Sequence, residues 1–287
     1  MALDLTISMT GANGDSITFD YGTYILTEGL KGFGIPSTSL RIQASATDGG
    51  VFRHTKRGIR EVQLPIMTVG TDRADVETKL RRLSNIMQNS SGATTLTATY
   101  ANGDVFNLGV YYAGGGETQF GQNAGTTYAM WLVTLQAPNP FWTYNTAQTV
   151  TIANAPAGRG LLPALSKLRV SPGSWLGSVT VNNSLGDVAS YPKWTIYGPV
   201  TGLQIVNQSN VGFTYPTTIG AGEIITIDTG LGTVVDAGGV NKYASLGLAP
   251  KLFSLPPGTT KVSVSGSGAT TSTQVLCTYY PKREVLH

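Results

Sequence analysis

Residues 60–89 read REVQLPIMTVGTDRADVETKLRRLSNIMQN, and this stretch holds two kinds of apolar spacing side by side. Val62, Leu64 and Ile66 alternate with other residues, as in a β-strand with one buried face. From residue 72 the apolar spacing changes to steps of three and four, which is typical of an amphipathic helix. We therefore predict a strand followed by a helix that packs against the same core.

The predicted helix covers residues 72–89. Thr71 or Asp72 can cap its first turn, where the helix dipole also favours the acidic Asp75. Gly92 follows the last turn and ends the helix. The apolar stripe of the helix consists of Val76, Leu80, Leu83, Ile86 and Met87.

Further strands are predicted around this helix. Residues 96–100 and 106–112 alternate, and Asn102-Gly103 between them favours a tight hairpin turn. Residues 128–135 are apolar at successive positions, which indicates a strand buried on both faces. Glycine-rich polar stretches at 114–125 and at 48–58 are predicted to be loops.

The second half of the chain shows no helical stripe. Turn residues divide it into short strands, which is the pattern of a β-sandwich or jelly roll. The predicted strands cover residues 178–181, 193–197, 202–206, 223–228, 233–235, 251–255, 260–265 and 274–280.

The length of 287 residues suggests about two domains. Prolines and glycines are frequent between residues 138 and 173, which marks the boundary. We expect a strand-rich N-terminal α+β domain at 1–145, a boundary segment at 146–175 and a C-terminal β-sandwich at 176–287. The fold class is mainly β.

Composition excludes several classes of protein. Charged residues make up 12% of the chain and the net charge is +3, without the concentrated basic patch of a nucleic-acid-binding domain. A single cysteine, Cys277, and two histidines, His54 and His287, exclude a disulfide scaffold and a multi-histidine metal site. We expect no cofactor and no metal. No apolar run reaches the roughly 18 residues of a membrane span, and no signal sequence begins the chain, so we expect synthesis in a cytoplasm and no membrane insertion.

No motif indicates catalysis. His54 has no GxSxG serine elsewhere in the chain, and Cys277 lies in an apolar strand, where a thiol is inert. Asp228 and Asp236 flank a predicted hairpin with Glu223 upstream; they are turn residues or, in the alternative, the paired carboxylates of a glycosidase. We expect no catalytic residues and no enzyme.

Two groups of residues are candidates for binding. Trp175, Tyr191, Trp194 and Tyr197 either belong to the sandwich core or stack on a sugar. Arg53, Lys56, Arg57 and Arg60 either form a solvated or subunit-facing segment or contact nucleic acid, which would need interleaved aromatic residues.

The order of several short motifs resembles the siphophage distal tail proteins. In the first half, a glycine-rich entry, an Asp-Gly turn, an arginine-led strand and a closing Pro-Phe-Trp segment are similar to that family's N-terminal domain: residues 29–36, 48–49, 60–66 and 137–142. In the second half, the similar segments are GEIITIDT at 222–229, GVN at 239–241, FSLPPG at 253–258 and YPKR at 280–283. Residues 114–125 and 146–175 match no segment of the family.

The resemblance implies a structural virion protein rather than an enzyme. Members of the family form a ring, usually a hexamer, at the distal tip of a non-contractile tail. Their partners are the tail tube protein, the tape-measure protein, the baseplate hub or tail-associated protein and the receptor-binding protein. The second domain of the family is often a galectin-like sandwich that projects outward and contacts the host surface.

Two expectations follow for the binding candidates. A channel that passes DNA should not hold phosphates, so Arg53, Lys56, Arg57 and Arg60 are expected at a subunit interface or the exterior. In the alternative function, a carbohydrate-binding module, the C-terminal sandwich recognises host cell-wall polysaccharide, and Trp175, Trp194 and Tyr197 are the residues expected to stack on it.

Overall fold

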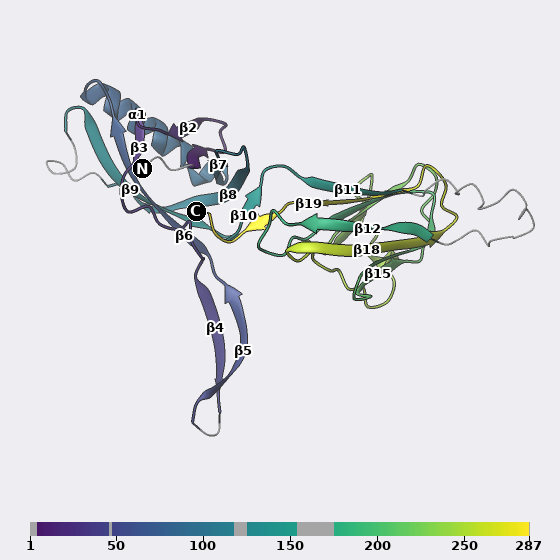
Figure 1. Ribbon diagram of the computed structural model, residues 1–287. Helices are drawn as coiled ribbons and strands as arrows, with labels where there is room; N and C mark the ends of the chain where they lie inside the picture. Colours follow the sequence, from purple (N-terminus) through teal and green to yellow (C-terminus); the bar gives the residue numbers. More distant parts are fainter. Residues whose placement is uncertain (1–4, 46–47, 118–124, 154–174, 287) are drawn as a thin grey trace, which may run out of the picture. The chain divides into compact units, whose positions relative to one another are not determined.

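The chain folds as two compact units in the computed structural model, which describes residues 5–45, 48–117, 125–153 and 175–286 (Figure 1). Unit 1 consists of Met1–Asn145 together with Arg283–His287, and unit 2 consists of Thr146–Lys282. The sequence predicts that the C-terminal end belongs to the second domain, at 176–287. The chain instead returns to unit 1 at Arg283, so unit 2 is an insertion within unit 1.

Unit 1 is built on an antiparallel sheet with the strand order β2-β1-β7-β8-β9-β6-β3, and β10 pairs with β8. Two further strands, β4 and β5, form a separate hairpin. The strands are β1 (Leu5–Thr10), β2 (Ser16–Phe19), β3 (Tyr24–Leu26), β4 (Thr38–Ala44), β5 (Gly50–Arg57), β6 (Arg60–Val69), β7 (Thr94–Tyr100), β8 (Val105–Gly115), β9 (Tyr128–Ala137) and β10 (Trp142–Tyr144).

The core of unit 1 lies against one side of this sheet. Along β6, burial alternates with the pleat, and Val62, Leu64 and Ile66 are almost completely buried, as the sequence predicted. Apolar residues of β1, β7, β8 and β9 complete the same core. The core therefore forms where the sequence shows period-two alternation.

The predicted helix is confirmed as α1 (Arg73–Ile86), which ends three residues earlier than expected. Asp72 caps it, since its carboxylate accepts a hydrogen bond from the Asp75 N–H at 2.9 Å. Val76, Leu83 and Ile86 are buried. The chain then forms a short 3₁₀ helix, η1 (Asn89–Ser91), instead of another α-helical turn.

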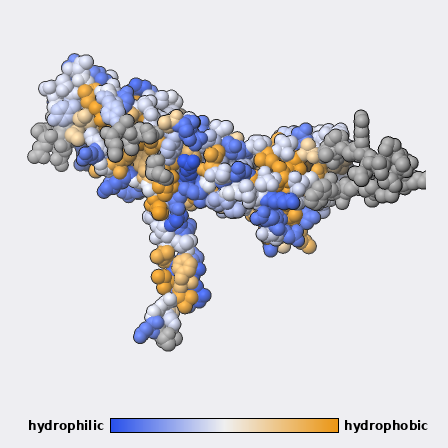
Figure 2. All heavy atoms as spheres, viewed as in Figure 1, coloured by the Kyte–Doolittle hydropathy of each residue, from blue (hydrophilic) through white to orange (hydrophobic). Residues whose placement is uncertain are grey.

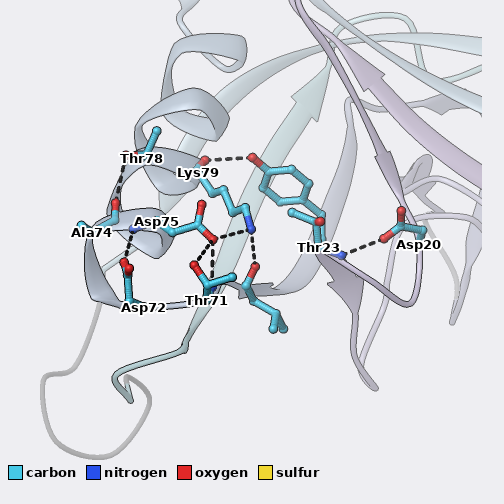
Figure 3. A network of polar contacts seen from close by, with 10 residues as sticks. Asp20, Thr23, Thr71, Asp72, Ala74, Asp75, Thr78 and Lys79 are labelled. Carbon is cyan, nitrogen blue, oxygen red and sulfur yellow. Dashed lines mark hydrogen bonds and ion pairs between the residues drawn. The ribbon is translucent and has the colours of Figure 1, made fainter.

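Polar contacts join the start of α1 to the strands beneath it (Figure 3). The Asp75 carboxylate accepts from Lys79 Nζ at 2.8 Å and from the Thr71 N–H at 2.9 Å. Lys79 Nζ also donates to the Val69 carbonyl at 3.0 Å, and the Tyr24 hydroxyl donates to the Lys79 carbonyl at 3.0 Å. The helix is thereby held to β6 and β3 at its N-terminal half.

Unit 2 is a sandwich of two antiparallel sheets, with the strand orders β11-β19-β13-β16-β17 and β12-β18-β14-β15. Its elements are β11 (Gln148–Ala153), β12 (Trp175–Asn183), β13 (Lys193–Tyr197), β14 (Thr201–Asn207), β15 (Gly212–Tyr215), β16 (Ile224–Asp228), β17 (Thr233–Asp236), η3 (Tyr243–Ser245), β18 (Gly258–Ser267) and β19 (Gln274–Tyr279); the short β20 (Lys282–Arg283) follows at the boundary with unit 1. The mainly-β fold class is confirmed.

The two sheets of unit 2 enclose a second core. Trp194 and Ile196 of β13 are fully buried together with Ile205 of β14 and Val264 of β18. One predicted strand is wrong: residues 251–255 form no strand, and within them Leu255 makes an isolated bridge to Ser190. The flanking Pro250 and Pro256 lack the N–H that a strand ladder needs.

Candidate interaction surface

The β4–β5 hairpin is the candidate surface, and it replaces the loop predicted at 48–58. At its base the Gly58 N–H donates to the Ser37 carbonyl at 2.7 Å. At its far end the Ser45 N–H donates to the Gly49 carbonyl at 3.2 Å. Gly49 has a φ of +98°, which glycine adopts without the steric cost of a side chain.

The strand register divides the hairpin into two faces. Leu40 lies opposite Thr55, and Ile42 lies opposite Phe52, so these four side chains share one face. We call it the apolar face of the hairpin. A bulge between Arg41 and Ile42 leaves Arg53 on the other side, beside Gln43. The basic face carries Ser39, Arg41, Gln43, Arg53, His54 and Lys56.

Both faces of this hairpin are open to solvent. All of β4 and nearly all of β5 are exposed, including Leu40 (61%), Ile42 (61%) and Phe52 (58%). Figure 1 shows the hairpin extending from the sheet of unit 1, and Figure 2 shows hydrophobic residues along it. An isolated two-stranded hairpin is marginally stable in water, and an exposed apolar patch marks an interaction site. The hairpin is therefore the candidate interaction surface of unit 1.

Sequence reasoning found the basic residues of this segment and missed its apolar ones. The alternation of Leu40 and Ile42 before an Asp-Gly turn was a usable hairpin signal. The glycine content of residues 48–50 favoured a loop instead. Arg53 and Lys56 are confirmed only as exposed residues of the basic face, and an interface role for them stays a prediction.

Arg57 anchors the base of the hairpin rather than its exposed part. Its guanidinium forms an ion pair with Glu284, near the C-terminal end of the chain, and donates to the Thr38 hydroxyl. The Arg57 side chain is 35% exposed. Arg57 is positioned to hold the base of the hairpin to the C-terminal segment of unit 1.

Arg60 is not at the surface, which corrects the expectation that it faces a subunit interface. It is 1% exposed, and its guanidinium donates to the carbonyls of Gly32 (2.5 Å), Gly34 (2.6 Å), Pro140 (2.6 Å) and Glu284 (2.6 Å). A buried charge needs such partners because desolvation is costly. Arg60 thus has a structural role within unit 1.

The candidate sugar-stacking residues do not form one surface. Trp194 is completely buried, so it cannot stack on a sugar in this structure. Tyr197 is partly buried and lies three residues further along β13, on the opposite face of the sheet. Trp175 begins β12, but its side chain lies outside the described residues. Tyr191 is 53% exposed, with Lys282 Nζ 5.5 Å from its ring centroid.

The carboxylates considered for glycosidase chemistry stabilise turns. Asp228 lies opposite Thr233, whereas Asp236 lies opposite Ile225, so the two acids are at opposite ends of the β16–β17 pair. Asp236 accepts from the Gly238 and Val240 N–H groups at 2.9 and 3.0 Å. The Val240 hydrogen bond, with smaller contributions from Gly238 and Lys242, lowers the pKa of Asp236, which keeps it an anion rather than a proton donor.

Asp236 and Glu223 also line an open depression of about 540 Å³ in unit 2. The Glu223 carboxylate accepts from the Gly220 N–H at 2.7 Å. Both acids of the depression are therefore engaged by backbone groups, which is the behaviour of turn residues.

The remaining candidates show no reactive arrangement. His54 is exposed on β5, and Cys277 is fully buried, where desolvation raises the pKa of its thiol to about 12. Among the described residues, no group of three or more histidine, cysteine, aspartate or glutamate side chains is placed to hold a metal ion. Within those same parts of the chain, no helix is long and apolar enough to cross a membrane.

Comparison with known proteins identifies the fold. No family model matches the sequence, and no curated protein matches it. Among solved structures, the chain is similar to SPP1 Dit (gp 19.1), described as a paradigm of the hub adsorption apparatus in phages infecting Gram-positive bacteria: TM-score 0.68 and 12% identity, over 96% of this chain and 98% of that chain.

Two structures of the phage P2 baseplate in its activated conformation are also similar. With Ca the TM-score is 0.53 at 11% identity, covering all of both chains. With Sr it is 0.53 at 11% identity, over 98% of this chain and 99% of that one. The sequence resemblance to distal tail proteins is thereby confirmed at the level of the fold, and the match includes both units.

Proposed function

We propose that this chain, which has the fold of SPP1 Dit, is a structural component of a phage tail. It forms a ring, most simply a hexamer, at the distal end of a non-contractile tail. Unit 1 builds the ring, which joins the tail tube and tape-measure protein to the baseplate hub and receptor-binding protein. Unit 2 faces outward. The protein is made in the host cytoplasm and resides in the virion.

The exposed β4–β5 hairpin is the observation that carries this proposal. Its apolar face has no cover within the described residues of the chain, and covering it requires another molecule. A projecting element that inserts into a different surface of a neighbour makes a heterologous contact, and repeated heterologous contacts generate a ring when the rotation between neighbours closes. The similarity to Dit and baseplate structures over nearly the whole chain supports the same role.

The basic face of the hairpin fits this arrangement. If the apolar face is the buried one, Arg53 and Lys56 point away from it, towards the rim of the contact or the exterior. Charged residues are usual at the rims of interfaces and are depleted from their centres. We propose no role at the interface for Arg60.

The mass of the particle in solution tests the proposal. A variant in which an Asn-Gly turn joins Ser37 directly to Gly58 removes the hairpin and keeps the hydrogen bond at its base. We expect the wild-type chain to form a defined oligomer and the deletion variant to be a folded monomer, as measured by light scattering and circular dichroism.

The matched control is Leu231→Ser in unit 2, which also removes an exposed apolar side chain (77% exposed) and should keep the oligomer. A wild-type chain that stays monomeric at every concentration, and is missing from tail tips labelled with antibody to unit 2, would contradict the proposal.

A further inference from the structure

The outer side of strands β6 and β9 carries a second apolar surface. Three cross-strand pairs point away from the core: Pro65 with Leu132, Met67 with Met130, and Val69 with Tyr128. We call these six residues the apolar ladder. Leu132 is 53% exposed, Tyr128 38% and Met130 37%. The sequence predicted β9 to be buried on both faces, and that prediction is wrong for the chain by itself.

The remainder of the sheet shows that the ladder is unusual. On β1 and β7 the residues that point away from the core are hydroxylic: Thr6, Ser8, Thr95, Thr97 and Thr99. An antiparallel sheet with one face in water normally has such polar residues on that face. The ladder instead has the composition of a covered face.

A depression lies on the ladder. It has a volume of about 330 Å³, and its lining includes Pro65, Met130, Leu132, Thr27 and Glu117. A concave site within an apolar surface accepts one large side chain as an anchor, and aromatic residues are enriched among such anchors. Phe52, on the apolar face of the hairpin, is an exposed aromatic of this type.

The charges of the two surfaces are complementary. The exposed part of the hairpin contains three basic residues, Arg41, Arg53 and Lys56, and one acid, Asp48, for a net charge of +2, because Arg57 is paired with Glu284 at the base. Around the ladder, Glu61 lies on the same side of β6, Glu117 lines the depression, Glu28 follows Thr27, and Lys31 bridges to Gln63. These four sum to −2, so rim charges attract the hairpin to this surface.

We propose that the apolar ladder of one copy receives the apolar face of the β4–β5 hairpin of the next copy, with Phe52 in the depression beside Leu132. This inference rests on the proposed ring function and names the acceptor surface. Both surfaces are exposed in the same chain, and they differ from each other. The contact is therefore heterologous, and every subunit both gives a hairpin and receives one.

Cysteine crosslinking of the full chain tests the pairing. The native Cys277 does not interfere, because it is buried and its thiol pKa is about 12. We expect that mixing Phe52→Cys chains with Leu132→Cys chains, under mild oxidation or with a short bismaleimide, gives covalent dimers. Each variant by itself should give none. A chain that carries both Phe52→Cys and Leu132→Cys should give a series of crosslinked oligomers, and the largest should contain as many subunits as the ring.

The matched control pairs Phe52→Cys with Thr97→Cys, which lies on the hydroxylic part of the sheet and should give no crosslinked product. Circular dichroism verifies that each variant is folded. Linking of Phe52→Cys chains to one another would overturn the inference, because it shows a two-fold contact. A wild-type oligomer in which Phe52 and Leu132 never link overturns the acceptor surface and leaves the ring proposal standing. A wild-type chain that stays monomeric and is missing from the tail tips overturns both.

Discussion

Arg60 connects three parts of unit 1 that are far apart in sequence. Its guanidinium donates to carbonyls at Gly32 and Gly34, at Pro140 and at Glu284, so one side chain holds the entry to the hairpin, the connection between β9 and β10, and the C-terminal segment. Hydrogen bonds from a charged donor are stronger than neutral ones, and the loss of the donor removes one partner from each of four partly buried carbonyls.

We expect Arg60→Met to lower the free energy of unfolding by about 3 kcal/mol, because it removes the donor of a buried charge-assisted network. The free energy of unfolding of Arg60→Lys should lie between those of the wild type and Arg60→Met, since lysine has fewer donors and lacks the planar guanidinium. Urea unfolding followed by circular dichroism measures the effect. The control, Arg53→Met on the exposed hairpin, should stay within about 0.5 kcal/mol of wild type. An equal effect of both substitutions would contradict the structural role of Arg60.

The sequence identifies residue types that suit a site, but the position of each side chain in the fold decides its role. Trp194 was assigned either to a core or to a sugar site, and only its position on the inner side of β13 distinguishes the two. Arg60 looked like a member of a basic exposed run, because its carbonyl partners come from up to 224 residues away. Partners so distant leave no local pattern.

At the scale of elements, two ion pairs, Asp75–Lys79 and Asp15–Arg82, hold α1. The Lys79 side chain, followed by the Thr71 N–H, lowers the pKa of Asp75. The Arg82 guanidinium lowers the pKa of Asp15, which it contacts at 2.6 Å, and so ties the helix to the start of β2. Both carboxyls are partly exposed to solvent, so each contact is modest, but together they hold the outer side of the helix.

These contacts predict an acid-sensitive helix. A carboxyl with a lowered folded-state pKa stabilises the fold above its unfolded value, near 3.8, and loses that contribution as the pH falls through the lower folded value. We expect amide hydrogen exchange in α1 to accelerate below about pH 4 relative to exchange in β6. Asp75→Asn should weaken this pH dependence, and a variant that keeps the wild-type profile would contradict it.

Helices and strands were predicted well where their apolar side chains are buried by other residues of the same chain. β6, α1, β7 and the strands of unit 2 with clear alternation are confirmed. The failures fall on residues 48–58, taken as a loop although they contain β5, and on β9, taken as buried on both faces. Period-two alternation indicates which side chains are buried in the functional assembly. It does not indicate whether they are buried by the same chain or, as we propose, by another copy.

At the scale of the whole molecule, the C-terminal segment completes unit 1. Leu286 is 4% exposed within the first core, and its N–H donates to the Phe33 carbonyl at 2.9 Å. The Arg283 guanidinium lies 4.3 Å from the ring centroid of Phe106, a favourable cation–π distance. A single apolar residue near the end of a chain forms no periodic pattern, so sequence reasoning could not place it.

Removal of residues 283–287 should destabilise unit 1 and leave unit 2 unchanged. The deletion removes Leu286 from the core and the Glu284 carbonyl from Arg60, for an expected loss of about 3 kcal/mol or more. Differential scanning calorimetry of the full and truncated chains measures the result as a downward shift of one transition. Leu286→Ala, which keeps the backbone contacts, should give a smaller shift of the same transition. A truncated chain with both transitions unmoved would contradict this role.

The return of the chain to unit 1 has a mechanical consequence. Unit 2 is tethered by two peptide crossings, one after Asn145 and one before Arg283, so a pulling force on it divides between two covalent lines. One proteolytic nick in either crossing leaves the other intact. The two crossings also make unit 2 exchangeable. A different sandwich domain can be inserted between Asn145 and Arg283 while unit 1 keeps both of its chain segments.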